Sequence, residues 1–243
     1  MPTPPLFPDV DSVSQLAIDW ISGNWYLADE ARAALYVCDA ALASCRLLLD
    51  AALHRVRGLA LDPTAGLMFW SVWGGSPAAV ERAGLAGGAR AALAERRVVQ
   101  PGALALDAAA RQLYWADAHF ESVERADYDG GNRLTVYKQY QSSRVRLLSL
   151  LESTLYLPEW AGWRVVGVSR FPRERRLNAL PLPEQPVGAL VYHRQRQPLV
   201  PHPCGAARGG CAHLCVTAYR GAEPHAHCLC RHGYRLVGHG DCE

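Results

Sequence analysis

The sequence predicts an all-β protein in which several propeller blades are followed by a small disulfide-rich module. Three observations support this prediction. Aromatic clusters recur about every 43 residues, no segment keeps a helical 3.6-residue period over 12 residues, and six of the eight cysteines lie in the last 40 residues. A cysteine density of this kind is typical of small domains made in an oxidising compartment.

Composition narrows the class of protein. Of the 243 residues, 50% are hydrophobic and 20% are charged, which indicates a globular chain. The formal net charge is only +2, so a nucleic-acid partner is not expected. No apolar run approaches the about 18 residues that cross a bilayer, and residues 1–12 resemble no secretory signal. Disulfide-rich modules occur in extracellular proteins, yet this sequence shows neither a secretory signal nor a membrane-spanning segment. We therefore expect it to be a piece of a longer extracellular protein.

Three features of the repeat keep one register. The aromatic anchors are separated by 43, 45 and 42 residues and are Tyr26, Phe69, Tyr114 and Tyr156. An apolar run ending in Asp precedes three of the anchors, at residues 16–19, 59–62 and 104–107, and residues 187–190 offer a fifth copy. The sequence Val-Glu-Arg-Ala occurs at residues 80–83 and again at 123–126. An accidental similarity within a β-sandwich would not keep three features in step.

Each unit is expected to form four short strands. In the third unit, the apolar run ending at Asp107 is followed by a turn and by an aromatic strand around Tyr114. A third strand covers residues 122–127, and Asp129-Gly130-Gly131-Asn132 forms the turn into a fourth. Four strands per unit of about 40–50 residues are the signature of a β-propeller.

The third unit also resembles a known family. Tyr114-Trp115-Ala116-Asp117, set between residues 105–107 and 124–133, is similar to the YWTD repeat (class B repeat) of the low-density lipoprotein receptor family. That resemblance implies a six-bladed propeller followed by an EGF-like module. Residues 191–198 and the pair Cys38 and Cys45 are similar to the first propeller of low-density lipoprotein receptor-related protein 1 and its paralogue.

The resemblance covers nearly the whole chain and divides it into three parts. We expect an irregular N-terminal segment at residues 1–13, propeller blades at 14–200 and an EGF-like module at 201–243. Since the blades number about four where the family has six, the predicted propeller is incomplete. We expect an open arc with the face of its first blade uncovered.

The motif residues are expected to be structural. They are predicted to pack between blades or to hold turns rather than to contact ligands, and they are Tyr26, Asp29, Phe69, Trp70, Tyr114, Trp115, Asp117 and Tyr156. The family pattern is broken at Val72, where it has Asp, and at Leu27, where it has Trp. Loss of the Asp should leave polar groups unpaired, at a cost of about 1–3 kcal/mol.

The C-terminal cysteines follow the pattern of an EGF-like module. Residues 228–236 match its C-x-C-x-x-G-aromatic core, although six cysteines by themselves allow 15 pairings. The resemblance selects Cys204–Cys215, Cys211–Cys228 and Cys230–Cys242. Separately, Cys38 and Cys45 lie within disulfide reach if residues 40–43 form a hairpin turn.

No cofactor is expected in this chain. Residues 199–203, which precede the module, hold no carboxylate, so we predict no calcium site there, although the resemblance allows calcium elsewhere in the full receptor. A zinc site is the alternative interpretation of the crowded ligands His225, His227, Cys228 and Cys230.

The sequence predicts a binding module rather than an enzyme. It holds no G-x-S-x-G, H-E-x-x-H or Walker motif, and Asp19, Asp62 and Asp107 recur before turns as turn formers do. The resemblance implies the extracellular part of an endocytic receptor for protein or lipoprotein ligands, with no membrane contact by this chain itself. The alternatives are a secreted, nidogen-like matrix or signalling protein and a calcium-dependent propeller hydrolase.

Histidines suggest a response to acid. Six of nine lie in the last 42 residues, and imidazole titrates near pH ~6.5. Because the resemblance implies release of ligands in endosomes, one hypothesis is that His193 and His202 form a pH switch that controls how the EGF-like module docks on the last blade. The alternative is that exposed histidines in this arginine-rich chain have no specific role.

Overall fold

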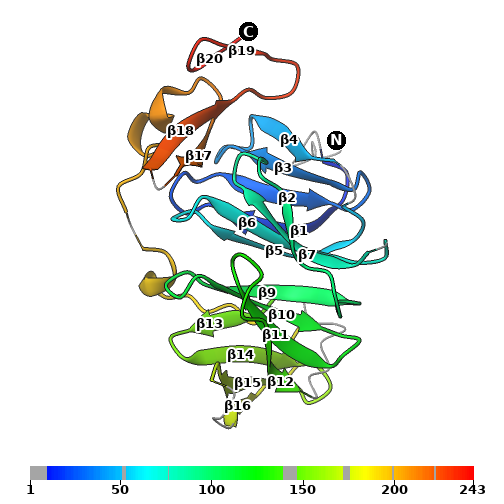
Figure 1. Cartoon of the computed structure of the whole chain (residues 1–243). Coiled ribbons are helices and arrows are strands. Elements are labelled where there is room, and N and C mark those ends of the chain that lie inside the picture. The colour runs from blue at the N-terminus through cyan, green and yellow to red at the C-terminus, as the bar shows by residue number, and fades with distance from the viewer. Residues whose placement is uncertain are drawn as a thin grey trace.

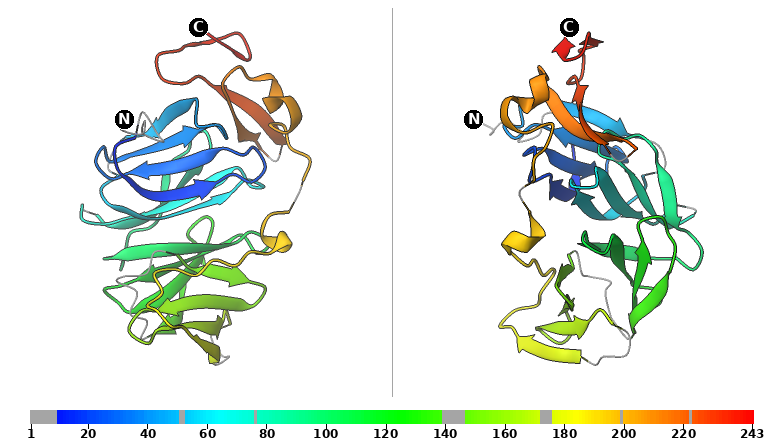
Figure 2. Two further views of the ribbon diagram at one scale, coloured as in Figure 1. Left: turned by 180° about the vertical axis from the view of Figure 1, so that it is seen from behind. Right: turned by 60° about the vertical axis from the view of Figure 1, so that its left-hand side comes forward.

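The computed structural model describes residues 10–50, 53–75, 77–138, 147–171, 176–198, 200–221 and 223–243. Within these residues the protein is all-β, with four antiparallel four-stranded sheets followed by two short hairpins (Figures 1 and 2). The helical elements of this part are two 3-10 turns, η1 (Arg194–Arg196) and η2 (Ala206–Gly210). No helix in it is long and apolar enough to cross a membrane.

Each sheet is one blade, with its strands in chain order. Blade 1 holds β1 (Val13–Ile18), β2 (Trp25–Asp29), β3 (Ala34–Cys38) and β4 (Cys45–Leu49). Blade 2 holds β5 (Val56–Asp62), β6 (Leu67–Val72), β7 (Ala79–Gly84) and β8 (Ala91–Ala94). Blade 3 holds β9 (Pro101–Asp107), β10 (Gln112–Asp117), β11 (Ser122–Asp127) and β12 (Leu134–Lys138). Blade 4 holds β13 (Ser149–Leu151), β14 (Thr154–Glu159), β15 (Arg164–Ser169) and β16 (Arg176–Pro181). The expectation of about four blades of an incomplete propeller is confirmed.

Antiparallel pairing gives the arc two faces. Turns between first and second strands, and between third and fourth strands, lie on one face, which we call the EGF face. Turns between second and third strands lie on the other, which we call the motif face because the motif aspartates Asp29 and Asp117 end their strands there.

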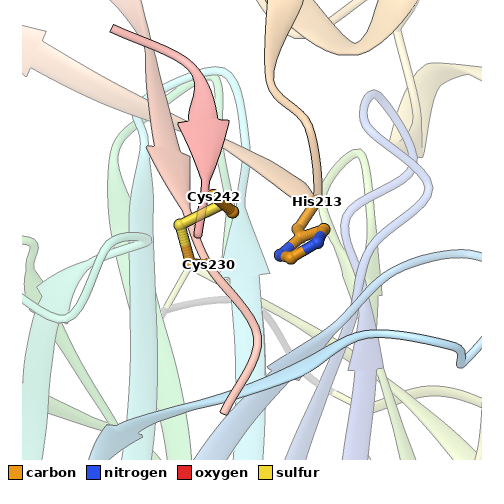
Figure 3. Close-up of side chains that lie close together, drawn as sticks. All are labelled: His213, Cys230 and Cys242. Carbon is orange, nitrogen blue, oxygen red and sulfur yellow. A yellow bond between two sulfur atoms is a disulfide. The ribbon is translucent and has the colours of Figure 1, made fainter. Parts of the chain in front are cut away.

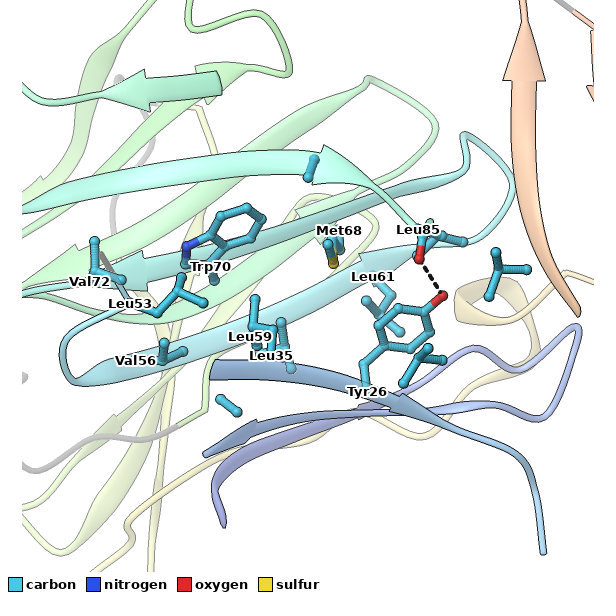
Figure 4. Packing of buried hydrophobic residues seen from close by; sticks show 14 of the residues in the cluster. Tyr26, Leu35, Leu53, Val56, Leu59, Leu61, Met68, Trp70, Val72 and Leu85 are labelled. Carbon is cyan, nitrogen blue, oxygen red and sulfur yellow. Dashed lines mark hydrogen bonds between the residues drawn. The ribbon is translucent and has the colours of Figure 1, made fainter. Parts of the chain in front are cut away.

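Side-chain alternation along the strands builds the core between blades. Trp70 on β6 packs back toward blade 1, in a cluster with Tyr26, Leu35 and Leu53 (Figure 4). Its neighbour Phe69 points the other way and packs against blade 3. The period of two residues therefore gives each inner blade two buried faces, as expected for stacked sheets.

The two ends of the arc differ from this pattern. On β1, Val13, Leu16 and Ile18 are 39–50% exposed on the side that has no preceding blade. On the two middle strands of the same blade, however, Leu27 and Tyr36 are buried in a cluster with Val10. Leu47 on the outer strand β4 lies opposite Tyr36 and is 37% exposed. The expected uncovered face is therefore open along its inner and outer strands and covered in the middle.

At the other end, residues 187–190 occupy the place of a fifth inner strand. Leu147 forms a parallel bridge with Gly188, and the Ser149 hydroxyl both donates to Ala189 O at 2.9 Å and accepts from the Val191 N–H at 3.0 Å. The inner strands of blades 2 and 3 also lie close together. A side chain at Gly58 would not fit there, because its Cβ would lie 2.4 Å from the backbone oxygen of Gly102. Among the described residues, this fifth copy of the repeat therefore forms a bridge to blade 4 but no strand of its own.

The elements around the expected domain boundaries are as follows. Residues 1–9 of the expected irregular segment 1–13 lie outside the described residues, and β1 begins at Val13. The last blade strand, β16, ends at Pro181, and a connecting segment then leads through η1 to Cys204. The EGF-like module consists of η2, the hairpin β17 (Leu214–Arg220) and β18 (Glu223–Leu229), and the small hairpin β19 (Leu236–Val237) and β20 (Asp241–Cys242).

The module docks on blades 1 and 2, not on the last blade as expected. Asn24 Nδ2 donates to Cys215 O at 2.6 Å, and Leu214 and Val216 enter the core that these two blades share. Gly66 has φ +65° and a Cβ there would lie 2.5 Å from the Tyr219 ring, so the turn in blade 2 needs glycine. The reason for the difference is the connecting segment, which returns along the EGF face (Figure 2) and is held where Trp20 Nε1 donates to Pro198 O at 3.3 Å.

Candidate functional site

The motif aspartates are buried and hold backbone amides. Asp117 accepts from four N–H groups, those of Val99 at 3.0 Å, Gln100 at 3.3 Å, His119 at 3.0 Å and Phe120 at 3.4 Å. Asp29 does the same with Asp11 at 2.8 Å, Ser12 at 3.3 Å, Ala31 at 2.9 Å and Arg32 at 3.2 Å. Each carboxylate therefore ties its own turn to the segment that enters the blade, which leaves it little capacity for a ligand.

The motif aromatic side chains lie between blades. The Tyr26 hydroxyl donates to Leu85 O of blade 2 at 3.0 Å, and burial raises the pKa of Tyr26 well above its usual value. Phe69, Tyr114 and Trp70 are fully buried. Tyr156 on blade 4 is partly exposed, because a following blade would have to cover it.

The two motif tryptophans share a second repeated contact. The guanidinium of Arg90 lies 5.6 Å from the Trp70 ring centroid, and that of Arg133 lies 5.0 Å from the Trp115 ring. Each arginine also pairs with the glutamate of the Val-Glu-Arg-Ala sequence, Arg90 with Glu81 at 2.7 Å and Arg133 with Glu124 at 3.4 Å. These stacks cover buried rings, so they stabilise the blade rather than form a surface for ligands.

The structure contains four disulfides. Cys38 lies directly opposite Cys45 in the β3–β4 register, with 4.1 Å between their Cα atoms. In the module the bonds are Cys204–Cys215, Cys211–Cys228 and Cys230–Cys242. The family resemblance implied this pairing.

A three-residue cluster in the module has the residue types of a metal site. His213 lies beside Cys230 and Cys242, with their ligand atoms within 4.8 Å of one another (Figure 3). The two sulfur atoms are bonded to each other, however, so they offer no thiolate to a metal. His213 Nδ1 instead accepts the Arg231 N–H at 3.3 Å. The zinc alternative at His225, His227, Cys228 and Cys230 fails for the same reason, because both of its cysteines are in disulfides.

His202 lies where the module meets blade 1, whereas His193 lies elsewhere. His202 Nδ1 accepts the Cys204 N–H at 3.2 Å, and Nε2 contacts the Thr217 hydroxyl of β17. Burial lowers the pKa of His202, and the charge of Asp19 on blade 1 opposes this shift to a smaller extent. His193 is exposed at the start of η1, where its Nδ1 accepts the Gln195 N–H at 3.3 Å.

The structure also reveals exposed aromatic side chains that the sequence interpretation missed. Phe120 and Trp163 are 41% and 48% exposed in the turns of blades 3 and 4 on the motif face. Trp73 occupies the same turn of blade 2, with the guanidinium groups of Arg55 and Arg57 at 5.6 and 5.7 Å from its ring. The sequence could have indicated these residues, because each aromatic residue follows the end of a motif strand by one to four positions.

The recurring aspartates before the first turns hold those turns. Asp19 accepts the Ile21 N–H at 2.9 Å, and Asp107 accepts the Ala110 N–H at 3.0 Å and pairs with Arg170. Asp62 accepts from the Thr64 N–H at 3.1 Å and from the Tyr128 hydroxyl of blade 3 at 3.0 Å. Burial raises the pKa of Tyr128, so this hydroxyl stays a donor.

Two curated relatives were found by sequence. The chain is 32% identical over 230 residues to the vitellogenin receptor Yl of Drosophila melanogaster, covering 94% of the chain and 11% of that receptor. It is 34% identical over 139 residues to human low-density lipoprotein receptor-related protein 4, covering 56% of the chain and 7% of that protein. The chain therefore spans about a tenth or less of either relative. No protein-family model matches it.

Solved structures share the fold. A crystal structure of a nidogen/laminin complex matches 74% of the chain and 68% of its own chain, with a TM-score of 0.67 at 22% identity. A luciferin-regenerating enzyme matches 74% of the chain and 66% of its own, with a TM-score of 0.58 at 17% identity. The repeated aromatic strands, the blade architecture with its EGF-like module and the two receptor relatives agree: this chain is a propeller and EGF-like region that belongs to the low-density lipoprotein receptor family.

Proposed function

We propose that this chain is a non-catalytic, extracellular binding region of an endocytic receptor, and that the motif face contacts protein ligands. The observation that carries the proposal is the row of aromatic side chains Trp73, Phe120 and Trp163, presented by equivalent turns of three successive blades. Phe120 and Trp163 are exposed, and Trp73 is half-buried beside two arginines. Aromatic residues and arginine are enriched where proteins bind one another. Kinship with two receptors supports this proposal, and uptake of the ligand would be the work of the longer receptor.

A hydrolase is the weaker candidate. The luciferin-regenerating enzyme shares only the fold, and the recurring carboxylates of this chain hold turn amides. A lactonase and phosphatase assay with added calcium should give no turnover. A nidogen-like matrix protein remains the second alternative. A full-length transcript that encodes a secreted protein without a membrane anchor would favour it.

A binding experiment tests the motif face directly. The full chain is immobilised, and purified vitellogenin and plasma low-density lipoprotein are passed over it. The double variant Phe120→Ser and Trp163→Ser should weaken binding of at least one probe about tenfold or more. Leu180→Ser is the matched control, because Leu180 is 63% exposed but lies on the outer strand β16. The proposal would be contradicted if the double variant bound the probes as well as Leu180→Ser does, or if the unchanged chain bound neither probe.

Acid-dependent release is part of the proposal, with His202 as the sensor. Because Nδ1 accepts the Cys204 N–H, the neutral ring carries its proton on Nε2 and donates to Thr217. Protonation of Nδ1 would place two donors face to face and loosen the start of the module, which lies beside Asp19 of blade 1. The charged group facing the ring from blade 1 is Asp19. We retain His202 and not His193 as the switch, since the exposed His193 does not join the module to a blade.

A further inference from the structure

A large cavity of the described part lies on the EGF face, away from the proposed protein-binding turns. Its volume is about 770 Å³. Leu61, Leu106 and Leu150 of three successive blades line it, with Trp20 and Phe171 at its sides. The connecting segment crosses it at residues 195–198. A pocket of this size that is lined mostly by apolar side chains, with polar groups among them, is typical of small-molecule sites.

One cation in this cavity lacks an opposite charge. Arg196 Nη1 donates to Leu106 O at 3.0 Å and to Leu150 O at 2.5 Å, which fixes the guanidinium against two blades. No ion pair joins Arg196 to a carboxylate among the described residues. Partial burial lowers the pKa of Arg196, and the nearby Tyr128 opposes this shift to a smaller extent.

The other charged residues of the lining do not satisfy Arg196. Arg170 is paired with Asp107, so this pair is neutral overall. Glu152 is exposed, where solvent screens its charge. A half-buried cation with two carbonyl partners and no anion gains most from a carboxylate, through a charge-assisted hydrogen bond.

We propose that this cavity binds a small apolar molecule that carries one carboxylate, with the carboxylate against Arg196 and the apolar part among Leu61, Leu106, Leu150 and Trp20. The site is independent of the motif face. Binding here would also hold the connecting segment against blades 3 and 4, because Arg196 belongs to that segment.

Calorimetric titration of the full chain with decanoate tests this proposal, with 1-decanol as the uncharged analogue of the same chain length. We expect one decanoate per chain and at least tenfold weaker binding of decanol. Arg196→Gln should weaken decanoate about tenfold. Arg194→Gln is the matched control, because Arg194 is exposed in the same turn, and it should leave the affinity unchanged.

Two further measurements keep the test sharp. Ala109→Trp fills the cavity from an exposed turn and should abolish binding even if Arg196→Gln fails to fold. The ¹³C shift of carboxyl-labelled decanoate should show a lower carboxyl pKa when bound than when free. Equal affinity for decanol, an equal loss in Arg194→Gln, or unchanged binding by Ala109→Trp would each overturn the proposal.

Discussion

Blades 2 and 3 have nearly the same framework but differ at one motif position. Both bury a tryptophan under an arginine that pairs with a glutamate. Blade 3 ends its motif strand with Asp117, which accepts four backbone N–H groups, whereas blade 2 has the apolar Val72 there. A cavity of about 130 Å³ beside Val72 is lined by His54 and Gly75, the counterparts of Val99 and Phe120.

The difference separates two tasks of the motif. Strand pairing and burial of the aromatic rings survive in blade 2, since Phe69 keeps the register that Tyr114 has in blade 3. Attachment of the entering segment to the motif turn is what blade 2 loses. The aspartate therefore joins segments around a blade that the aromatic core already forms.

The largest effect is expected when blade 3 is made like blade 2. Asp117→Val should destabilise the chain by about 3 kcal/mol, because it removes an acceptor from four amides in a buried turn. Urea unfolding followed by tryptophan fluorescence measures the change. Asp129→Ala, which removes a carboxylate that holds one exposed amide at 2.8 Å, is the control and should cost far less. Equal losses would contradict the assigned role of Asp117.

The outer hairpin of blade 1 offers the second comparison. It is closed by Cys38–Cys45, where blades 2 and 3 have arginine–glutamate pairs. The double change Cys38→Ala and Cys45→Ala should cost about 2 kcal/mol, since a short loop gains least from a cross-link. The same urea titration measures it, and non-reducing peptide mapping of the unchanged chain should recover all four disulfides. An unchanged midpoint in urea would show that β3 and β4 need no covalent closure.

Blade 2 is expected to gain stability from the missing carboxylate. Val72→Asp should stabilise the chain by about 1 kcal/mol, because the new side chain reaches the turn and entering amides around His54 and Gly75. Val72→Leu, which adds volume without an acceptor, is the control. A lower urea midpoint for Val72→Asp than for Val72→Leu would mean that blade 2 has rearranged beyond this repair.

The smallest effect is expected from pH. The docked module lowers the pKa of His202, so the docking stability is fully present above the unfolded value near 6.5. It is lost as the pH falls from there through the folded pKa. Amide exchange of residues 215–217, corrected for intrinsic rates, should therefore be faster at pH 5.5 than at 7.4. His202→Gln should remove the difference and His193→Gln should keep it, and the reverse result would rule out His202 as the sensor.

The repeat made much of the fold predictable. Strand alternation and the spacing of Tyr26, Phe69, Tyr114 and Tyr156 are local features, so the sequence predicted four blades of four strands. The structural role expected for Asp117 follows from its place at a strand end. Phe120 and Trp163 were missed because exposure of a turn residue depends on what neighbouring blades leave uncovered.

The sequence by itself determined the blade count, the all-β class and the cysteine pattern, because strand periods and cysteine spacing are written along the chain. Only the tertiary structure decided where the EGF-like module sits, since the segment after β16 returns across the EGF face to blades 1 and 2. It also decided that His202 lies near Asp19 of blade 1 and that Arg196 is half-buried without an ion pair to a carboxylate among the described residues. These outcomes depend on contacts between residues as much as 191 positions apart, and no local pattern records such distances.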